Sequence, residues 1–314
     1  MILVTGARGQ IGSDLVAALR QRYGPTRVVA SDLKEPSGGA RNGLPYEVLD
    51  VTDRQQLDAV LAHYKIDTVV HLASLLSARG EQQPNLCWKV NVGGLRNVLG
   101  LAVERGLKVF WPSSIAVFGP HTPRHHTPQT TVEDPSTMYG ITKVTGELLC
   151  RYYARSHQVD VRSVRLPGII SYTTPPGGGT TDYAVEIFYE ALRYGTYTCF
   201  VRPDTRLPMM YMPDAVKAVI DIMAAPAAAI EVRSSYNIAA VSFSAEELVA
   251  EIQRHLPAFT CRYKPDFRQA IADTWPVDID DSRAQQDWGW QHACDLSFIV
   301  EDMLEKLSER VSSF

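Results

Sequence analysis

Tyr139 and Lys143 are the residues of this sequence whose types and spacing most directly suggest proton chemistry. Their Y-x-x-x-K spacing predicts that the phenol and the ammonium share one face of a helix. A phenol ionises at about pH 10 in water, so its pKa must fall by roughly 3, at a cost of about 4 kcal/mol, before it acts as a base near neutrality. We expect burial beside the Lys143 ammonium, with a further positive charge nearby, to supply this shift. An exposed pair of the same spacing is common by chance, and it could not lower the pKa of the phenol in this way.

The segment PSSIAVFG offers a hydroxyl for the same chemistry. Ser113 and Ser114 end a predicted strand, and we assign Ser114 as the donor to the reacting oxygen. The alternative is that both serines only terminate the strand. Asn91, in KVNVGG, could orient a water or a backbone group next to Lys143, or could be purely structural, and the sequence favours neither interpretation.

A parallel sheet is predicted to position these residues. Through the first half of the chain, short β-branched runs alternate with segments that carry apolar residues at helical spacing. This rhythm predicts an α/β fold, a doubly wound parallel sheet of the Rossmann type that binds ligands at the carboxyl ends of its strands. The predicted strands cover residues 2–5, 27–31, 46–49, 68–72, 108–112 and 161–166, and the predicted helices cover residues 11–23, 54–64, 92–105 and 139–156.

The turn after the first predicted strand suits the pyrophosphate of a dinucleotide. The segment ILVTGARGQIG places Gly6, Gly9 and Gly12 between that strand and the first helix. Glycines there permit a tight turn and a close backbone approach at the positive end of a helix. The spacing is G-x-x-G-x-x-G rather than G-x-G-x-x-G, and a glycine triplet alone could mark a mere turn.

Asp32 ends the second predicted strand, 20 residues after Gly12, where a carboxylate can bond both hydroxyls of a ribose. Because a carboxylate there repels a 2′-phosphate, the sequence predicts NAD rather than NADP, unless Asp32 only caps a turn. Asp50 and Val51 are expected near the adenine, although Asp50 could equally begin the following helix. The predicted cofactor contacts are Gly6, Gly9, Gln10, Ile11, Gly12, Asp32, Leu33, Asp50, Val51, Leu72, Ala73, Ser74, Asn91, Tyr139, Lys143 and Leu166.

After about residue 170 the regular alternation ends. A loop rich in Pro and Gly, 173–181, precedes a predicted helix over 183–194. We expect residues 1–170 to form an NAD-binding domain, and residues 171–314 a smaller substrate-binding lobe that interleaves with it and is not an independent domain. Further helices are predicted over residues 214–223, 245–255 and 296–308.

Composition and charge exclude several other functions. The formal net charge of −4 favours neither nucleic acid nor anionic lipid as a partner. The five cysteines show no zinc-binding spacing, and His121, His125 and His126 lie in a segment without carboxylate partners, so we expect no metal site. No apolar run reaches the ~20 residues of a membrane span and no leader precedes the first strand, which predicts a cytoplasmic protein.

Taken together, these motifs resemble those of the extended short-chain dehydrogenase/reductase family. The likeness lies in GARGQIG, Asp32, HLAS, the Asn of KVNVGG, PSSIAVFG and YGITK, over about residues 1–170. The resemblance implies a catalytic triad of Ser114, Tyr139 and Lys143, with Lys143 also bonding the nicotinamide ribose.

The second half resembles the L-threonine 3-dehydrogenase branch of that family. The resemblance lies in RLPGIISYTTPPGGGTTDYAVEIFYEAL, in PMMYMPDAVKA, in the WP pair at Trp275 and in SRAQQDWGW. Members that act on nucleotide sugars usually carry an aromatic residue and an Asn soon after the Arg of the first segment. Pro167 and Gly168 follow Leu166 here instead, which argues against a nucleotide-sugar substrate.

The resemblance implies oxidation of L-threonine to 2-amino-3-oxobutyrate with NAD and without a metal. It also implies a homodimer that pairs through helices such as those over 95–105 and 139–156. The alternatives are a nucleotide-sugar epimerase or dehydratase that keeps its NAD tightly bound, and a non-catalytic NAD-sensing or scaffold protein. The amino acid would be surrounded by Ser74, Ser77, Ser114, Tyr139, Thr180, Thr181 and Trp275.

Overall fold

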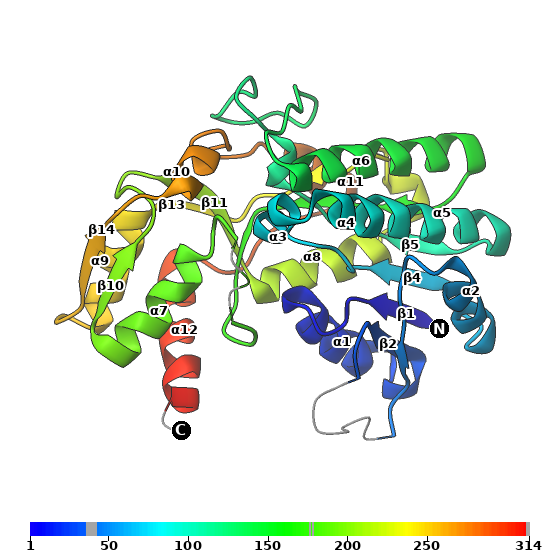
Figure 1. Cartoon of the computed structure of the whole chain (residues 1–314), viewed down its shortest axis with the longest axis horizontal. Coiled ribbons are helices and arrows are strands. Elements are labelled where there is room, and N and C mark those ends of the chain that lie inside the picture. Colours follow the sequence, from blue (N-terminus) through cyan, green and yellow to red (C-terminus); the bar gives the residue numbers. More distant parts are fainter. Residues whose placement is uncertain (36–42, 176, 178, 312–314) are drawn as a thin grey trace.

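The computed structural model describes residues 1–35, 43–175, 177 and 179–311. The strands at its centre are β1 (Ile2–Thr5), β2 (Val28–Asp32), β3 (Tyr46–Val48), β4 (Thr68–His71), β5 (Lys108–Phe110) and β7 (Val161–Arg162). Within the described residues these strands form a six-stranded parallel sheet, in the order β3-β2-β1-β4-β5-β7 (Figure 1). The predicted fold class is confirmed. The order reverses between β1 and β4, which is where such sheets bind ligands.

Two of the predicted strands are interrupted. Pro112 has no amide hydrogen to give to a ladder, and pairing resumes after it at β6 (Ser113–Ser114). The predicted strand over 161–166 is divided into β7 and β8 (Val164–Leu166). β8 pairs in parallel with β6 on one side and with β12 (Tyr236–Asn237) on the other, so these strands prolong the sheet.

Helices cover both faces of the sheet: on one face lie α2 (Arg54–His63), α5 (Gly94–Arg105) and α6 (Met138–His157), and on the other lie α1 (Gln10–Tyr23) and α8 (Met212–Ala224). Leu3 and Val4 are neighbours in β1 and are both fully buried. Leu3 packs in the cluster that contains residues of α2, α5 and α6, whereas Val4 packs with residues of α1 and α8. Because successive strand residues point to opposite faces, this division makes the sheet doubly wound.

Several short elements were not predicted from the sequence. Two short helices follow β4, and both pack against α6, the helix that carries Tyr139. A π-helical turn containing Asn91 continues into α5. These elements are α3 (Ser77–Gln82), α4 (Pro84–Trp88), the π-helical turn Lys89–Gly93 and the 3₁₀ turns Pro25–Arg27, Ile115–Val117 and Ala227–Ala229.

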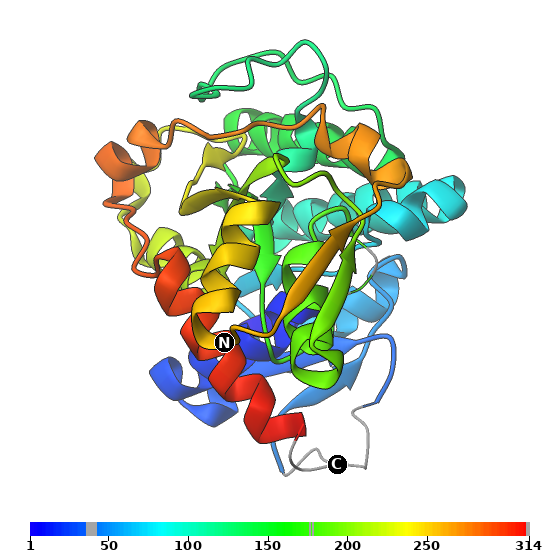
Figure 2. The same cartoon turned by 90° about the vertical axis from the view of Figure 1, so that its left-hand side faces the viewer.

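The lobe, which begins at β9 (Gly168–Ile170), mixes helices with short strands. Its other elements are α7 (Tyr183–Tyr194), β10 (Thr196–Cys199), β11 (Arg206–Tyr211), β13 (Val241–Ser244), α9 (Ala245–His255), β14 (Thr260–Tyr263), α10 (Phe267–Ala272), α11 (Ser282–Trp288) and α12 (Leu296–Val311). β11 pairs with β9 and β13, and β10 pairs with β14. α12 lies beside α9, as Figure 2 shows. The bounds of α7 and α9 agree with the prediction, whereas the strands of the lobe were missed.

The two halves of the chain interleave. α8 packs on α1, and β12 extends the parallel sheet, although both follow the first helix of the lobe in the sequence. A boundary at residue 170 therefore does not divide the molecule into two separate bodies.

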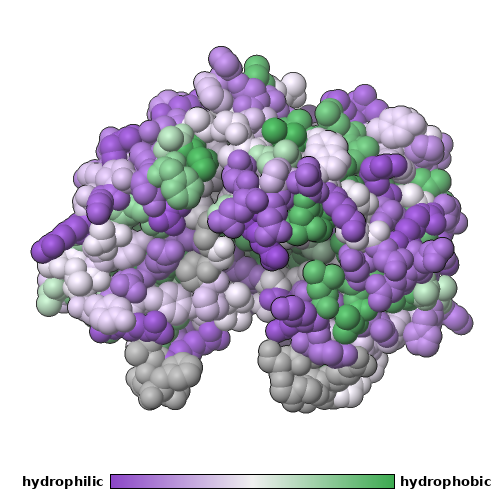
Figure 3. Space-filling view, viewed as in Figure 1, coloured by the Kyte–Doolittle hydropathy of each residue, from purple (hydrophilic) through white to green (hydrophobic). Residues whose placement is uncertain are grey.

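Among the described residues, no helix combines the length and the apolar character that crossing a bilayer requires. On the face drawn in Figure 3, hydrophilic and hydrophobic residues are interspersed. Exposed apolar side chains on α5 and α6 include Val103, Ile141, Leu148 and Tyr152. These are the helices expected to pair in a homodimer, and the homodimer itself stays a prediction.

Candidate active site

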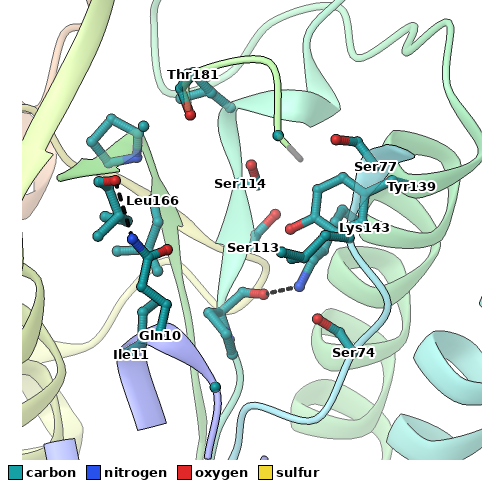
Figure 4. Close-up of a pocket in the computed structure, with 18 of the residues that line it drawn as sticks. Gln10, Ile11, Ser74, Ser77, Ser113, Ser114, Tyr139, Lys143, Leu166 and Thr181 are labelled. Carbon is teal, nitrogen blue, oxygen red and sulfur yellow. Dashed lines mark hydrogen bonds between the residues drawn. The ribbon is translucent and has the colours of Figure 1, made fainter. Parts of the chain in front are cut away.

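A cavity of about 240 Å³ lies at the carboxyl ends of the parallel strands and is closed on its other side by the lobe (Figure 4). A second cavity of about 350 Å³ shares lining residues such as Gly6 and Leu72 with it. Asn91 is buried outside both linings, whereas the other predicted site residues are brought together here. The first cavity is lined by Gly6, Gly9, Gln10, Ile11, Gly12, Leu72, Ser74, Ser77, Ser114, Tyr139, Lys143, Leu166, Thr180, Thr181 and Trp275, and the second adds Asp32, Leu33, Asp50, Val51 and Ala73.

The glycine turn brings β1, β4 and α1 into close contact. Gly6 has a φ of +68°, and a Cβ atom there would lie 2.7 Å from the amide nitrogen of Ala73. A Cβ at Gly12 would lie 2.2 Å from the carbonyl oxygen of Gly6. Gly9 is the N-cap residue of the 14-residue α1, and the first amides of such a helix attract anions. The turn is therefore built for glycine and has the form of a phosphate cradle.

Asp32 and Asp50 border the second cavity with fixed carboxylates. Asp32 accepts hydrogen bonds from the backbone amides of Arg8 (3.0 Å) and Leu33 (2.8 Å), which ties the end of β2 to the glycine turn. Asp50 accepts from the amide of Thr52 (2.9 Å). Asp53 is the residue that caps α2, so the alternative that Asp50 begins this helix is wrong.

Tyr139 lies in the first turn of α6, which begins at a tightly fixed position. The Thr137 hydroxyl caps the helix by accepting from the amide of Gly140 (3.1 Å). A Cβ at Gly140 would lie 2.3 Å from the carbonyl oxygen of Ala116, so the start of α6 presses against the turn that follows Ser114. Figure 4 shows Tyr139 and Lys143 reaching from α6 toward the strand that carries Ser114.

Lys143 is fully buried and has a fixed partner. Its Nζ atom donates a 2.6 Å hydrogen bond to the carbonyl oxygen of Pro112 and lies 4.6 Å from the centre of the Trp111 ring. Burial lowers the pKa of Lys143 to about 8. Burial raises the pKa of Tyr139 to about 12, and a hydrogen bond with Ser114 only partly opposes this. The expectation that burial helps the phenol to ionise is therefore wrong, because loss of solvation penalises the phenolate.

Asn91 connects the loop after β4 to α6. Its amide group accepts from the Leu75 amide (2.8 Å) and donates to the Leu75 carbonyl (3.1 Å). It also donates to the hydroxyl of Thr142, next to Lys143 (3.0 Å). Asn91 thus holds the backbone of Leu75, which lines the second cavity, and a contact of Asn91 with the cofactor stays a prediction.

The lobe closes the first cavity with Thr180, Thr181 and Trp275. A Cβ at Gly168 would lie 2.7 Å from Cγ2 of Thr181, so β9 and the threonine segment are in close contact. Asp182 accepts from the amide of Gly179 (2.6 Å) and so holds the turn that carries Thr180. Positions 176 and 178 of the predicted 173–181 loop lie outside the described residues.

Several lining residues were missed by the sequence analysis. No residue-type signal marks apolar or backbone wall positions, and only the proximity of Asp182 to Thr181 in the sequence could have suggested it. The missed residues are Leu76, Pro112, Ser113, Ile115, Pro167, Gly168, Ile169, Gly179 and Asp182.

The exposed histidines do have carboxylate partners, which corrects the sequence analysis. His121 Nδ1 lies 2.5 Å from Asp134, and His125 and His126 lie 3.5 and 3.1 Å from Asp278. Asp278 is remote in the sequence from His125 and His126, whereas Asp134 follows His121 by only 13 residues and its pairing was overlooked. Within residues 1–35, 43–175, 177 and 179–311, no group of three or more His, Cys, Asp or Glu side chains is arranged to hold a metal ion.

Comparison with known proteins identifies the family. A model of the NAD-dependent epimerase/dehydratase family matches residues 2–239. The chain belongs to that family. An uncharacterised epimerase/dehydratase of Staphylococcus haemolyticus is 49% identical over 311 residues, which cover 98% of both proteins. The resemblance noted in the first half of the sequence is thereby confirmed.

Solved structures are similar over the whole chain. L-threonine dehydrogenase from Phytophthora infestans is 54% identical, with a TM-score of 0.95 over 98% of this chain and 99% of that one. A monomeric L-threonine 3-dehydrogenase from a metagenome is 50% identical, with a TM-score of 0.95 over 99% of both chains. The resemblance of the second half therefore extends to solved structures.

NAD is the cofactor of this epimerase/dehydratase family member, and the residues present fit it. A Cβ at Gly6 or Gly12 would fill the cradle, so these positions leave the backbone open to a pyrophosphate. The carboxylate of Asp32 borders the second cavity, where a ribose diol would lie. The protein is an NAD-dependent oxidoreductase.

Proposed function

We propose that the enzyme oxidises the secondary alcohol of L-threonine to 2-amino-3-oxobutyrate with reduction of NAD. The close contact between Gly168 and Thr181 carries the choice of substrate. At Pro167 and Gly168, where nucleotide-sugar members of the family are expected to carry an aromatic residue and an Asn, this chain has no side chain suited to a diphosphate, and Thr180 and Thr181 line the cavity beside them. The high identity to L-threonine dehydrogenases over the entire chain supports this choice.

Tyr139 is proposed to take the proton of the substrate hydroxyl, and Ser114 to donate a hydrogen bond to the same oxygen. Lys143, held by the carbonyl of Pro112, favours the phenolate through its positive charge. The glycine turn and Asp32 would hold NAD, which would supply the hydride acceptor. The proton is therefore taken by a half-buried phenol that lies beside the fully buried Lys143.

The amino acid is proposed to lie between the loop after β4 and the lobe. Thr180 and Thr181 offer hydroxyls from the lobe, and Ser74 and Ser77 offer hydroxyls from the opposite wall. Trp275 also lines the cavity, and its backbone carbonyl accepts from Nε of Arg124 (3.0 Å). Small hydroxyl groups suit the ammonium and carboxylate of a small amino acid.

The test is NAD reduction by the purified protein with L-threonine, D-threonine, L-serine and a UDP-hexose, each before and after treatment with a chelator. We expect L-threonine to be oxidised best, because one missing methyl group in serine costs roughly 1–3 kcal/mol. We expect the chelator to leave the rate unchanged. Reaction with the UDP-hexose alone, on NAD that stays bound, would show an epimerase or dehydratase instead. Loss of activity that zinc restores would overturn the metal-free chemistry.

We also propose a homodimer that pairs through α5 and α6, on the basis of their exposed Val103, Ile141, Leu148 and Tyr152. Because a similar structure is described as monomeric, the mass in solution must be measured. Sedimentation should give twice the chain mass, and Leu148→Glu should give monomers. A dimeric Leu148→Glu variant would exclude this surface. The cytoplasmic location stays a prediction.

A further inference from the structure

Glu147 is a buried carboxylate behind the candidate active site. It follows Lys143 by four residues and Tyr139 by eight, so the three side chains lie along one face of α6. Only 1% of Glu147 is exposed. Oε1 accepts from the hydroxyl of Ser113 (2.6 Å) and from Nε of Arg165 (2.9 Å), and Oε2 accepts from Nη2 of Arg165 (2.7 Å).

These bonds join α6 to the two strands that border the cavity. Ser113 faces Arg165 in the register of β6 and β8, and the next pair is Ser114 and Leu166. Glu147 therefore holds both members of the pair that directly precedes the active-site pair. It does so from a position one helical turn beyond Lys143.

Lys143 and Glu147 form hydrogen bonds with successive residues of the same strand segment. Lys143 donates to the carbonyl of Pro112, and Glu147 accepts from the hydroxyl of the next residue, Ser113. Between them, Gly146 allows the closest approach of helix and strand, since a Cβ there would lie 2.3 Å from the Trp111 ring. The distance and the register between α6 and β6 are both fixed.

We propose that Glu147 is a positioning residue for the reaction: by holding Ser113 and Arg165 it sets the place of Ser114 relative to Tyr139 on the same helix. This inference rests on the proposed function, because it assumes that Ser114 and Tyr139 act on one substrate oxygen.

A contribution to stability alone does not explain why the Glu147 carboxylate is buried beside Arg165. A buried ion pair is weak evidence for stabilisation, because apolar side chains of similar volume often do as well. The bidentate contact with Arg165 fixes the orientation of Glu147, and Arg165 is itself held by Asn237 (3.0 Å), the Gln129 carbonyl (3.1 Å) and Glu133. A saturated network of this kind permits a single arrangement of the groups that it joins.

The charge of Glu147 acts in the same direction. It opposes the effect of burial on Lys143 and so raises the pKa of that ammonium, which is lowered to about 8 in total. Burial, together with the same negative charge, raises the pKa of the neighbouring Glu133 to about 7, while Arg165 and Arg151 oppose that rise. Glu147 thus supports the protonated lysine beside Tyr139 as well as the position of Ser114.

The first test compares Ser113→Ala with Ser163→Ala. Both serines are buried, and Ser163→Ala also removes one hydrogen bond, a 2.8 Å contact with Ser235 in which no residue of α6 takes part. With whichever alcohol the unaltered enzyme oxidises, we expect Ser113→Ala to lower kcat about tenfold or more, as small misplacements of reacting groups do. Its NAD affinity, measured by NADH fluorescence, and its Tm should match those of Ser163→Ala. Equal kcat values for the two variants would overturn the inference.

The second test asks whether the effect passes through Ser114. In a Ser114→Ala background, adding Ser113→Ala should leave kcat unchanged, because no hydroxyl remains to be positioned. A full additional loss would refute this route. Glu147→Gln, which keeps an acceptor for Ser113, should retain more kcat than Glu147→Ala. If neither Glu147 variant folds, the comparison of Ser113→Ala with Ser163→Ala still tests the inference. A substrate other than L-threonine would refute the proposed function but not this comparison.

Discussion

The ammonium of Lys143 lies 5.4 Å from the centre of the Tyr139 ring, one turn along the same buried face of α6. Burial favours the neutral form of both groups, raising the pKa of Tyr139 to about 12 and lowering that of Lys143 to about 8. The phenol therefore needs a positive charge beside it in order to ionise near neutrality.

Replacing Tyr139 by Phe should lower turnover by about 10²-fold or more, the usual scale of general acid–base catalysis. The ring that packs at the start of α6 is retained, so NAD affinity should change little. Steady-state kinetics and NADH fluorescence measure the two quantities. Near-normal turnover would mean that another group takes the proton.

The pH dependence of kcat should reveal the effect of Lys143 on the ionisation of Tyr139. The rate should rise with pH as Tyr139 loses its proton, and Lys143→Met should move this rise to higher pH by about one unit or more, since a nearby opposite charge shifts a pKa by that amount. The pH profile of kcat is the measurement. An unchanged profile in the variant would show that Lys143 does not act on the phenol.

Cofactor choice should depend on the charge of Asp32. The unaltered enzyme should use NAD far better than NADP, and Asp32→Ala should narrow the gap. Asp32→Asn is the sharper variant, because it removes the charge but keeps an oxygen that can accept from Arg8 or Leu33. The measurement is the ratio of kcat/KM with NAD to kcat/KM with NADP. Equal use of both cofactors by the unaltered enzyme would contradict the role assigned to Asp32.

The glycine cradle can be tested with a matched pair. Gly12→Ala should abolish NAD binding or folding, because the new Cβ would lie 2.2 Å from the Gly6 carbonyl oxygen. Gly100→Ala, in α5, meets no described atom within 4 Å and should stabilise the protein by about 0.5–1 kcal/mol. Thermal unfolding and NAD titration separate the outcomes. Tolerance of Gly12→Ala would refute the cradle.

His71 should make the protein sensitive to acid. Its Nδ1 bonds the Thr5 hydroxyl (2.8 Å), its Nε2 has no partner among the described residues, and burial lowers its pKa to about 3. Because the unfolded chain binds the proton at a pH near 6.5, stability is lost as pH falls below that value. The loss is about 2 kcal/mol at pH 5.

Urea unfolding at pH 7 and pH 5 measures this loss. His71→Gln, which can still bond Thr5, should lose less stability between the two pH values than the unaltered protein. Equal losses in both would assign the acid sensitivity to other groups.

The first half of the fold could be predicted because its strands and helices carry apolar residues at regular spacing. The interruptions of two predicted strands were not foreseen. Pro112 could have indicated the break between β5 and β6, whereas nothing in the sequence indicates the break at Ser163 between β7 and β8. The strands of the lobe do not alternate regularly with helices as those of the first half do, so their short apolar runs could not be distinguished from loops.

The candidate site could be predicted as far as local motifs reach. Ser114, Tyr139 and Lys143 lie in motifs, and the structure brings them to one cavity. The partners of the site come from remote segments: a glutamate in a helix is usually exposed, so Glu147 gave no signal of its contacts with Ser113 and Arg165. The sign of the burial effect on Tyr139 follows from the solvation of a phenolate, whereas its extent required the structure, because the helix face alone does not tell how far solvent is excluded.

The return of α8 and β12 to the parallel sheet has a consequence for biosynthesis. The core beside Val4 and Leu15 is completed by Val219 of α8 and Tyr236 of β12. A nascent chain that has emerged from the ribosome only as far as residue 170 holds the glycine turn and the tyrosine helix, yet one wall of its core is still missing. The nucleotide-binding half therefore reaches its native packing late in translation, after much of the lobe has been made.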